Sequence, residues 1–155
     1  MTTKFYKTTF LIATLLFSIS FLNISCKKIV LAAITRSQIE GLFEDNVLNK
    51  NFIVSFATDN GTDLTSQYTG YNFILTKTNS YYNGPMTGTK NGVTYTGTWT
   101  SNDDYSKLVI NITSPTPPAE FGFLNQSWKF TKKAFPTLEL APWGGELKVL
   151  HMKRL

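Results

Sequence analysis

The chain has 155 residues, the size of one domain, and 42% of them are hydrophobic, which is enough for a buried core. It carries 15 Lys and Arg against 10 Asp and Glu, a net charge of +5, to which Lys4 and Lys7 at the N-terminus contribute. The remaining basic residues are scattered, whereas a nucleic-acid surface needs them clustered, so we expect no nucleic-acid partner. A single cysteine, Cys26, excludes an internal disulfide, so the core alone must stabilise the fold.

The N-terminus has the layout of a secretory signal. Lys4 and Lys7 precede an apolar run from Phe10 to Phe21 that is too short to span a bilayer, and Ser25 puts a small residue directly before Cys26. The segment resembles the signal of bacterial lipoproteins, in which the cysteine is acylated and becomes the new N-terminus. This resemblance implies a signal peptide over residues 1–25 and a lipid attachment, such as palmitate, on Cys26. We expect the protein to be lipid-anchored in the cell envelope of a Gram-negative bacterium, at the outer membrane, while the inner leaflet, a periplasmic face and export to the surface stay open as alternatives.

Two other interpretations of this segment stay open. An uncleaved membrane anchor needs about 20 apolar residues, and the stretch from Thr8 to Ser25 is shorter and partly polar. An ordinary secretory signal would be cut after Ala32 or Ala33, which would place two lysines inside its apolar part.

A short helix is expected after a tether over residues 26–34. Ser37 and Glu40 have the spacing of a capping box, in which the serine hydroxyl accepts from a helix N–H and the glutamate reaches back. Apolar residues then recur at helical spacing as far as Val47, and the helix should end near Asn49. Residues 35–155 are therefore predicted to be one domain that begins with a helix.

From Asn51 onward the apolar period changes from helical to alternating. The clearest strand is 93–100, which has Val93, Tyr95, Gly97 and Trp99 on one face and threonines on the other. Similar patterns predict strands over 51–57, 68–77, 107–113, 126–132, 137–141 and 147–153, and a further irregular edge or bulged strand over 80–89. Asn60-Gly61, Asn91-Gly92 and Gly144-Gly145 have the chemistry of hairpin turns.

About eight antiparallel strands joined by short turns predict an all-β fold. We expect an antiparallel up-and-down eight-stranded β-barrel preceded by one short helix, because closure removes the exposed strand edges. A two-sheet β-sandwich is the alternative, since it has the same alternation. The Pro-rich bend over 114–118 is expected to let the chain cross one end of the barrel, which residues 121–124 then plug.

Short motifs along the strands resemble the lipocalin-like lipoproteins of Gram-negative bacteria. The resemblance implies a lipocalin-like barrel and, for some relatives of the wider fold, a hydrophobic ligand inside it. The motifs that carry it are Asp59-Asn60-Gly61-Thr62-Asp63-Leu64-Thr65, Gly70-Tyr71-Asn72-Phe73, Gly97-Thr98-Trp99, Leu108-Val109-Ile110, Leu124-Asn125-Gln126-Ser127-Trp128 and Met152-Lys153.

Alternation places a set of large apolar side chains on the inward face. In a barrel of this size, side chains either fill the interior or leave room for one small ligand. Bulky rings in this number favour a filled interior, although a ligand cavity stays open as an alternative. The candidate lumen residues are Phe52, Val54, Phe56, Tyr71, Phe73, Tyr95, Trp99, Trp128 and Phe130.

The sequence offers little catalytic chemistry. His151 is the only histidine, and no serine or cysteine nucleophile motif accompanies it. Asp59 with Asp63, and Asp103 with Asp104, lie in predicted turns, where aspartate caps the local backbone. We therefore expect no enzyme, no cofactor and no metal site.

Two functions remain as expectations. The leading one is a non-enzymatic, membrane-anchored binding module that takes a small apolar or amphipathic ligand in the barrel. The alternative is a surface interaction protein with a filled core and a protein or carbohydrate partner. Tyr81, Tyr82 and Trp143 lie in predicted loops or rims, where aromatic rings suit such contacts.

Overall fold

The structure, a computed structural model, describes residues 35–155. The expected signal peptide over residues 1–25, the tether over residues 26–34 and the attachment residue Cys26 therefore lie outside the described residues. Residues 36–155 form one unit.

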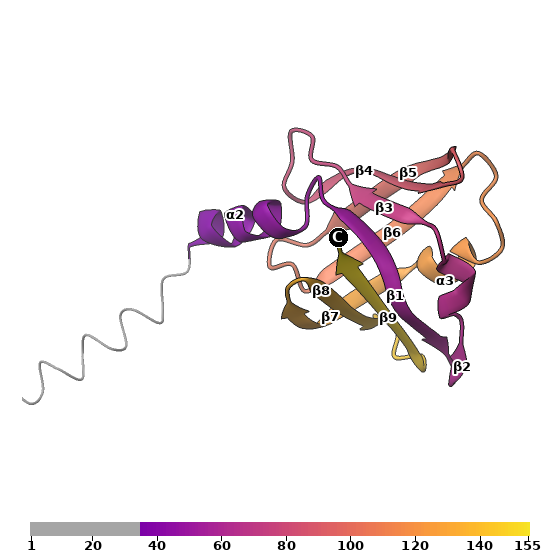
Figure 1. Cartoon of the computed structure of the whole chain (residues 1–155). Helices are drawn as coiled ribbons and strands as arrows, with labels where there is room; N and C mark the ends of the chain where they lie inside the picture. Colours follow the sequence, from indigo (N-terminus) through magenta and orange to yellow (C-terminus); the bar gives the residue numbers. More distant parts are fainter. Residues whose placement is uncertain (1–34) are drawn as a thin grey trace, which may run out of the picture. The chain divides into compact units, whose positions relative to one another are not determined.

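Eight antiparallel strands close into a barrel in which neighbours along the chain pair and the last strand pairs with the first (Figure 1). This arrangement confirms the predicted up-and-down barrel and rules out the two-sheet sandwich. A further two-residue strand, β2 (Thr62–Asp63), pairs with β1, and the 3-10 helix η1 (Thr65–Tyr68) follows it. The barrel strands are β1 (Asn51–Asp59), β3 (Asn72–Leu75), β4 (Asn83–Lys90), β5 (Val93–Ser101), β6 (Lys107–Ser114), β7 (Ser127–Ala134), β8 (Thr137–Pro142) and β9 (Lys148–Arg154).

The predicted Asn-Gly turns form as expected. Asn60 and Gly61 have φ angles of 49° and 82°, and Asn91 and Gly92 have φ angles of 51° and 78°. Two successive residues with positive φ match the right-handed twist of a hairpin, and asparagine and glycine tolerate that conformation best. The turn at Asn91-Gly92 joins β4 directly to β5.

The stretch from Ser80 to Thr89 differs from the prediction of an irregular edge or bulged strand. Its residues from Asn83 onward belong to β4, which pairs with β3 on one side and β5 on the other. Its glycines make room for neighbours: a Cβ on Gly84 would lie 2.1 Å from the backbone oxygen of Thr76, and one on Gly88 would lie 2.9 Å from the Phe73 ring. These glycines therefore mark close packing inside the barrel rather than a bulge.

The predicted strand over 68–77 is shorter than expected. Its first residue, Tyr68, ends the helix η1, and the strand β3 begins at Asn72. The carboxylate of Asp63 accepts a hydrogen bond of 2.8 Å from the backbone N–H of Thr65, where η1 begins. The backbone N–H groups of Thr69 and Tyr71 then donate to the carbonyls of Ser66 and Tyr68, and Gly70 has a φ of 85°, so the chain is still turning and β3 begins only after it.

The predicted helix forms as α2 (Arg36–Asn46), which projects from one end of the barrel in Figure 1. It begins before Ser37, so the predicted capping box is wrong; Glu40 instead accepts hydrogen bonds from the side chains of Arg36 and Tyr82. Phe43 and the following Val47 are buried and join the helix to the core. None of the helices in residues 35–155 is long and apolar enough to cross a membrane.

The opposite end of the barrel holds the short helix α3 (Phe121–Leu124), which follows the Pro-rich bend. Phe121, Phe123 and Leu124 are buried, so the predicted plug is confirmed. The residue after α3 extends the pairing between β6 and β7, which share three register pairs. There the side-chain amide of Asn125 accepts from the backbone N–H and donates to the backbone C=O of Ile112, both at 2.8 Å.

Candidate functional site

The interior contains nearly all of the side chains predicted to face it. Eight of the nine pack in or against one hydrophobic cluster. Those that are buried are Phe52, Val54, Tyr71, Phe73, Trp99 and Trp128, and those that are partly buried are Tyr95 and Phe130. The inward face was therefore predicted correctly for these residues, whereas their role in holding a ligand stays a prediction.

Phe56 is the exception, and its predicted place in the lumen is wrong. Its side chain is 39% exposed, and its ring lies 5.3 Å from the ring of His151, which is on the adjacent strand β9. The register between β1 and β9 shifts between Val54 and Phe56. This irregularity turns Phe56 outward and gives the next inward position to the buried Ala57.

Aromatic rings fill the end of the barrel that α3 closes. The ring of Phe121 lies 5.0 Å from Tyr71, 5.9 Å from Phe73 and 5.2 Å from Tyr95, all within the range of favourable ring contacts. The hydroxyl of Tyr71 donates to a carboxylate oxygen of Glu120 at 3.1 Å. Burial, helped by Glu120, raises the pKa of Tyr71 to about 12, so this hydroxyl is a fixed neutral donor.

A second set of rings fills the end nearest α2. Phe43 of α2 stacks on Tyr105 with a centroid distance of 4.1 Å, and Tyr105 stacks on Tyr82 at 5.4 Å. Below them, the indole N–H of Trp99 donates to the backbone oxygen of Thr76 at 3.0 Å. Tyr82, predicted to lie in a loop or rim, is therefore part of the packing between the helix and the barrel.

The described interior is thus occupied by side chains. Among the residues whose burial the structure describes, none that is polar or charged is buried, and no buried side-chain nitrogen or oxygen lacks a hydrogen-bond partner. Two hollows that these residues form lie on the outer wall of the barrel and beside α2. A binding site is therefore better sought on the outside.

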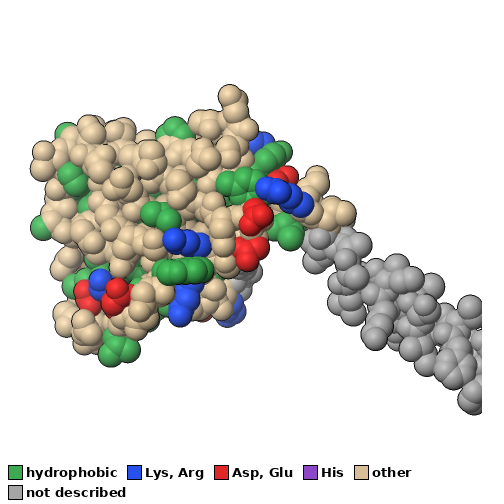
Figure 2. Space-filling view, turned by 180° about the vertical axis from the view of Figure 1, so that it is seen from behind, with side chains coloured by type: hydrophobic (Ala, Val, Ile, Leu, Met, Phe, Trp, Pro, Cys, Tyr) green, Lys and Arg blue, Asp and Glu red, His purple; other side chains and the backbone are tan. Residues whose placement is uncertain are grey.

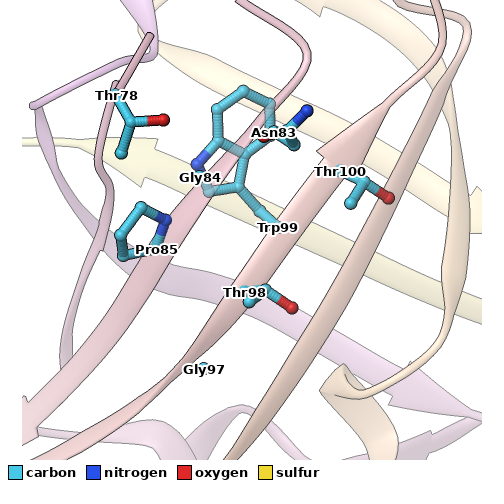
Figure 3. A pocket seen from close by; sticks show the side chains of 8 residues that line it. All are labelled: Thr78, Asn83, Gly84, Pro85, Gly97, Thr98, Trp99 and Thr100. Atoms are coloured by element: carbon cyan, nitrogen blue, oxygen red, sulfur yellow. The ribbon is translucent and has the colours of Figure 1, made fainter. Parts of the chain in front are cut away.

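The larger hollow is a groove of about 490 Å³ on the outer wall of β4 and β5. Two cross-strand pairs form its floor, Asn83 opposite Thr100 and Pro85 opposite Thr98, and the loop before β4 adds Thr78. Figure 3 shows Thr78 and Pro85 on one side of the Trp99 ring and the two β5 threonines on the other. We call this hollow the wall groove.

The wall groove is uncharged. Its lining consists of threonine, asparagine, proline and glycine residues with Trp99 behind them. Figure 2 shows one face of the molecule, on which the charged side chains gather in a few places and leave a broad area without charge. The alternation of β5 predicts its outward threonines but not the groove, because the groove also needs the loop that carries Thr78.

The smaller hollow, of about 200 Å³, lies between α2 and the barrel and is apolar. Leu42 and Phe135 are its exposed members, at 57% and 39% exposure. Its lining residues are Ile39, Leu42, Phe43, Tyr105 and Phe135. We call it the helix hollow.

The remaining candidates from the sequence are dispersed. Trp143 is 48% exposed, and the ammonium of Lys107 lies 5.2 Å from the centre of its ring. The ring of Tyr81 is covered by the ammonium of Lys77 at 3.8 Å. Asp63 accepts from the backbone N–H of Thr65 at 2.8 Å and Asp104 from that of Ser106 at 2.9 Å, as expected for aspartates in turns.

His151 lies on β9, and its ring contact is with Phe56. Within residues 35–155 no group of three or more His, Cys, Asp or Glu side chains is placed to hold a metal ion.

Comparison with known proteins gives a likeness of fold. No protein-family model and no curated protein matches the sequence. Among solved structures, the crystal structure of a DUF4847 family protein from Bacteroides vulgatus ATCC 8482 is similar, with a TM-score of 0.50 and 17% sequence identity. The similarity covers 71% of this chain and 95% of that chain. At this identity it supports the barrel architecture alone.

Proposed function

We propose that this protein is a lipocalin-like lipoprotein, anchored through Cys26 to the outer membrane of a Gram-negative bacterium, whose barrel is a non-enzymatic interaction module. Recognition takes place on the outside of the barrel. The observation that supports this best is the packed interior, in which Phe73, Trp99 and Trp128 are completely buried. A ligand lumen generally needs about 300–1,000 Å³, and opening one here would displace these rings.

The packed interior therefore favours the interaction module over capture of a small apolar or amphipathic ligand inside the barrel. Ligand capture remains the second candidate because the helix hollow offers an apolar surface of its own. Its volume of about 200 Å³ suits a small apolar group rather than a whole lipid.

Uptake measurements with a panel of fatty acids and sterols distinguish these functions. The full chain is mixed with each compound and examined by native mass spectrometry and by tryptophan fluorescence. We expect no saturable one-to-one uptake that quenches the buried Trp99 and Trp128. Uptake that disappears in Leu42→Gln would assign the ligand to the helix hollow, whereas uptake that quenches both tryptophans and survives Leu42→Gln would refute the packed interior.

The anchor is tested by metabolic labelling with palmitate. We expect the label in the unmodified chain and in Ser25→Ala, which keeps a small residue before the cysteine, and its loss in Cys26→Ala. Label that persists in Cys26→Ala would overturn the proposed attachment. Membrane fractionation of the same three proteins reports whether they reach the outer membrane.

A further inference from the structure

The wall groove combines two properties that the packing of the barrel does not require. It is the larger of the two hollows described above, and it lies where the chain is nearly free of charge. Between Lys90 and Asp103 the sequence contains no charged residue, and Lys77, near the loop that borders the groove, is paired with Glu44 at 2.8 Å. A ligand in the groove would therefore meet neutral polar groups.

The threonines of β5 divide into two kinds according to their partners. Outside the groove, the hydroxyl of Thr94 lies 3.4 Å from that of Thr89, and the hydroxyl of Thr96 donates to the backbone oxygen of Ser114 at 3.1 Å. Inside the groove, the hydroxyls of Thr98 and Thr100 have no hydrogen-bond partner among residues 35–155. The groove thus presents hydroxyls that are free to bond a ligand.

The floor of the groove is rigid. The pairing of β4 with β5 runs through eight consecutive register pairs without a shift. The loop that carries Thr78 is fixed at its start, because the backbone N–H of Thr76 donates to Pro85 at 2.8 Å and its oxygen accepts from the Trp99 indole at 3.0 Å. A site that is already ordered loses little conformational entropy when it binds.

The chemistry of the groove selects a class of ligand. A charged ligand would give up hydration without meeting an opposite charge, and a purely apolar ligand would leave the free hydroxyls unpaired. A ligand with ring C–H groups and many hydroxyls fits both kinds of group. Its C–H groups can pack on the threonine methyls and Pro85, and its hydroxyls can form hydrogen bonds with the threonine hydroxyls. We propose that the wall groove binds a neutral carbohydrate. This site rests on the proposed function, since it supplies the partner that the outside of the barrel recognises.

The proposal is tested by calorimetric titration of the full chain in lauryldimethylamine oxide, a detergent without a sugar group. The probes are neutral gluco-, manno-, galacto- and xylo-oligosaccharides, with oligogalacturonate as a charged comparison. Thr98→Val and Thr100→Val delete one hydroxyl each and keep the shape of the side chain. Thr113→Val is the matched control, because Thr113 is exposed on β6 but lies outside the groove.

We expect at least one neutral oligosaccharide to bind to the unmodified protein. Each groove variant should bind it about tenfold more weakly than the unmodified protein does, and Thr113→Val should bind it with unchanged affinity. Circular dichroism verifies that all three variants fold. The proposal is overturned if no neutral oligosaccharide binds at millimolar concentration, if oligogalacturonate binds more tightly, or if the groove variants bind as well as the control. These results would leave the outside of the barrel as a recognition surface for another partner, whereas fatty-acid uptake into the interior would refute the proposed function itself.

Discussion

Asn125 is the residue whose loss we expect to weaken the barrel at the seam between β6 and β7. The two strands share three register pairs, and the Asn125 side chain then bonds both backbone groups of Ile112, which is completely buried. In Asn125→Ala the N–H and C=O of Ile112 both lose their partners. The barrel has no other pairing at this point that could replace them, since β7 begins at Ser127.

The magnitude follows from these two groups. An unpaired buried donor or acceptor destabilises a protein by about 1–3 kcal/mol. The loss of both partners therefore destabilises this fold by about 2–6 kcal/mol if no water molecule bonds to the two groups. Asn125 is only partly buried, so water can enter its vacated place and restore part of the bonding. We therefore expect Asn125→Ala to lower the free energy of unfolding by about 2–4 kcal/mol.

Urea unfolding followed by tryptophan fluorescence measures this change. Asn111→Ala is the control, because Asn111 is an exposed residue of β6 at which a substitution should stay within about 0.5 kcal/mol. Equal free energies for the two variants would refute the role assigned to Asn125.

Asn125→Asp separates the two bonds. The introduced carboxylate can still accept from the Ile112 N–H, but it faces the Ile112 oxygen without a proton to donate. The protonated form restores that bond, so the pKa of the introduced carboxyl should rise above its unfolded value of about 3.9. The bond then stabilises the fold at pH values below about 4 and is lost as the pH rises through the native pKa. The difference in free energy of unfolding between Asn125→Asp and the unmodified protein should therefore become smaller as the pH is lowered.

Three further predictions concern the packing. Phe52→Ala should lower the free energy of unfolding by about 3–5 kcal/mol and Phe56→Ala by less than about 1 kcal/mol in urea titrations, because only the first is buried; equal losses would contradict the outward turn at the β1 irregularity. Gly97→Ala would place a Cβ 2.0 Å from a backbone oxygen of β6 and should lower the free energy of unfolding by about 1–3 kcal/mol. In the control Gly122→Ala the new Cβ meets nothing within 4 Å. An unchanged melting temperature for Gly97→Ala would be inconsistent with the close contact. The pKa of Tyr71, raised by burial to about 12, means that the unfolded chain ionises first, so stability present below about pH 10 should fall between pH 10 and 12. In Tyr71→Phe this fall should be smaller, and an unchanged urea midpoint across the range in both proteins would oppose the prediction.

Much of the fold was predictable because it rests on local chemistry. The alternation of β5 and the Asn-Gly turns are short-range patterns, and each specifies a hairpin without reference to the rest of the chain. The plug by α3 was predictable because prolines end a strand and the apolar residues after them must be buried somewhere.

The remaining features depend on contacts between distant segments. Both faces of β1 are partly apolar, so alternation alone could not place Phe56, and the shift that turns it outward arises from pairing with β9. The bonds from Asn125 to Ile112 span 13 residues across a seam that the sequence does not reveal. The free hydroxyls of Thr98 and Thr100 likewise follow from the register of neighbouring strands, since equivalent threonines on the same strand are bonded.

The closure of the barrel also orders the events of folding. β1 shares two register pairs with β3 but seven with β9, so most of β1 is held by a strand that follows it by roughly 100 residues. Bringing Phe52 opposite Arg154 closes a loop of roughly 100 residues, which opposes folding by about 4 kcal/mol of chain entropy. A nascent chain that has not reached β9 therefore leaves both β1 and β8 with open edges, and the barrel can close only after β9 is synthesised.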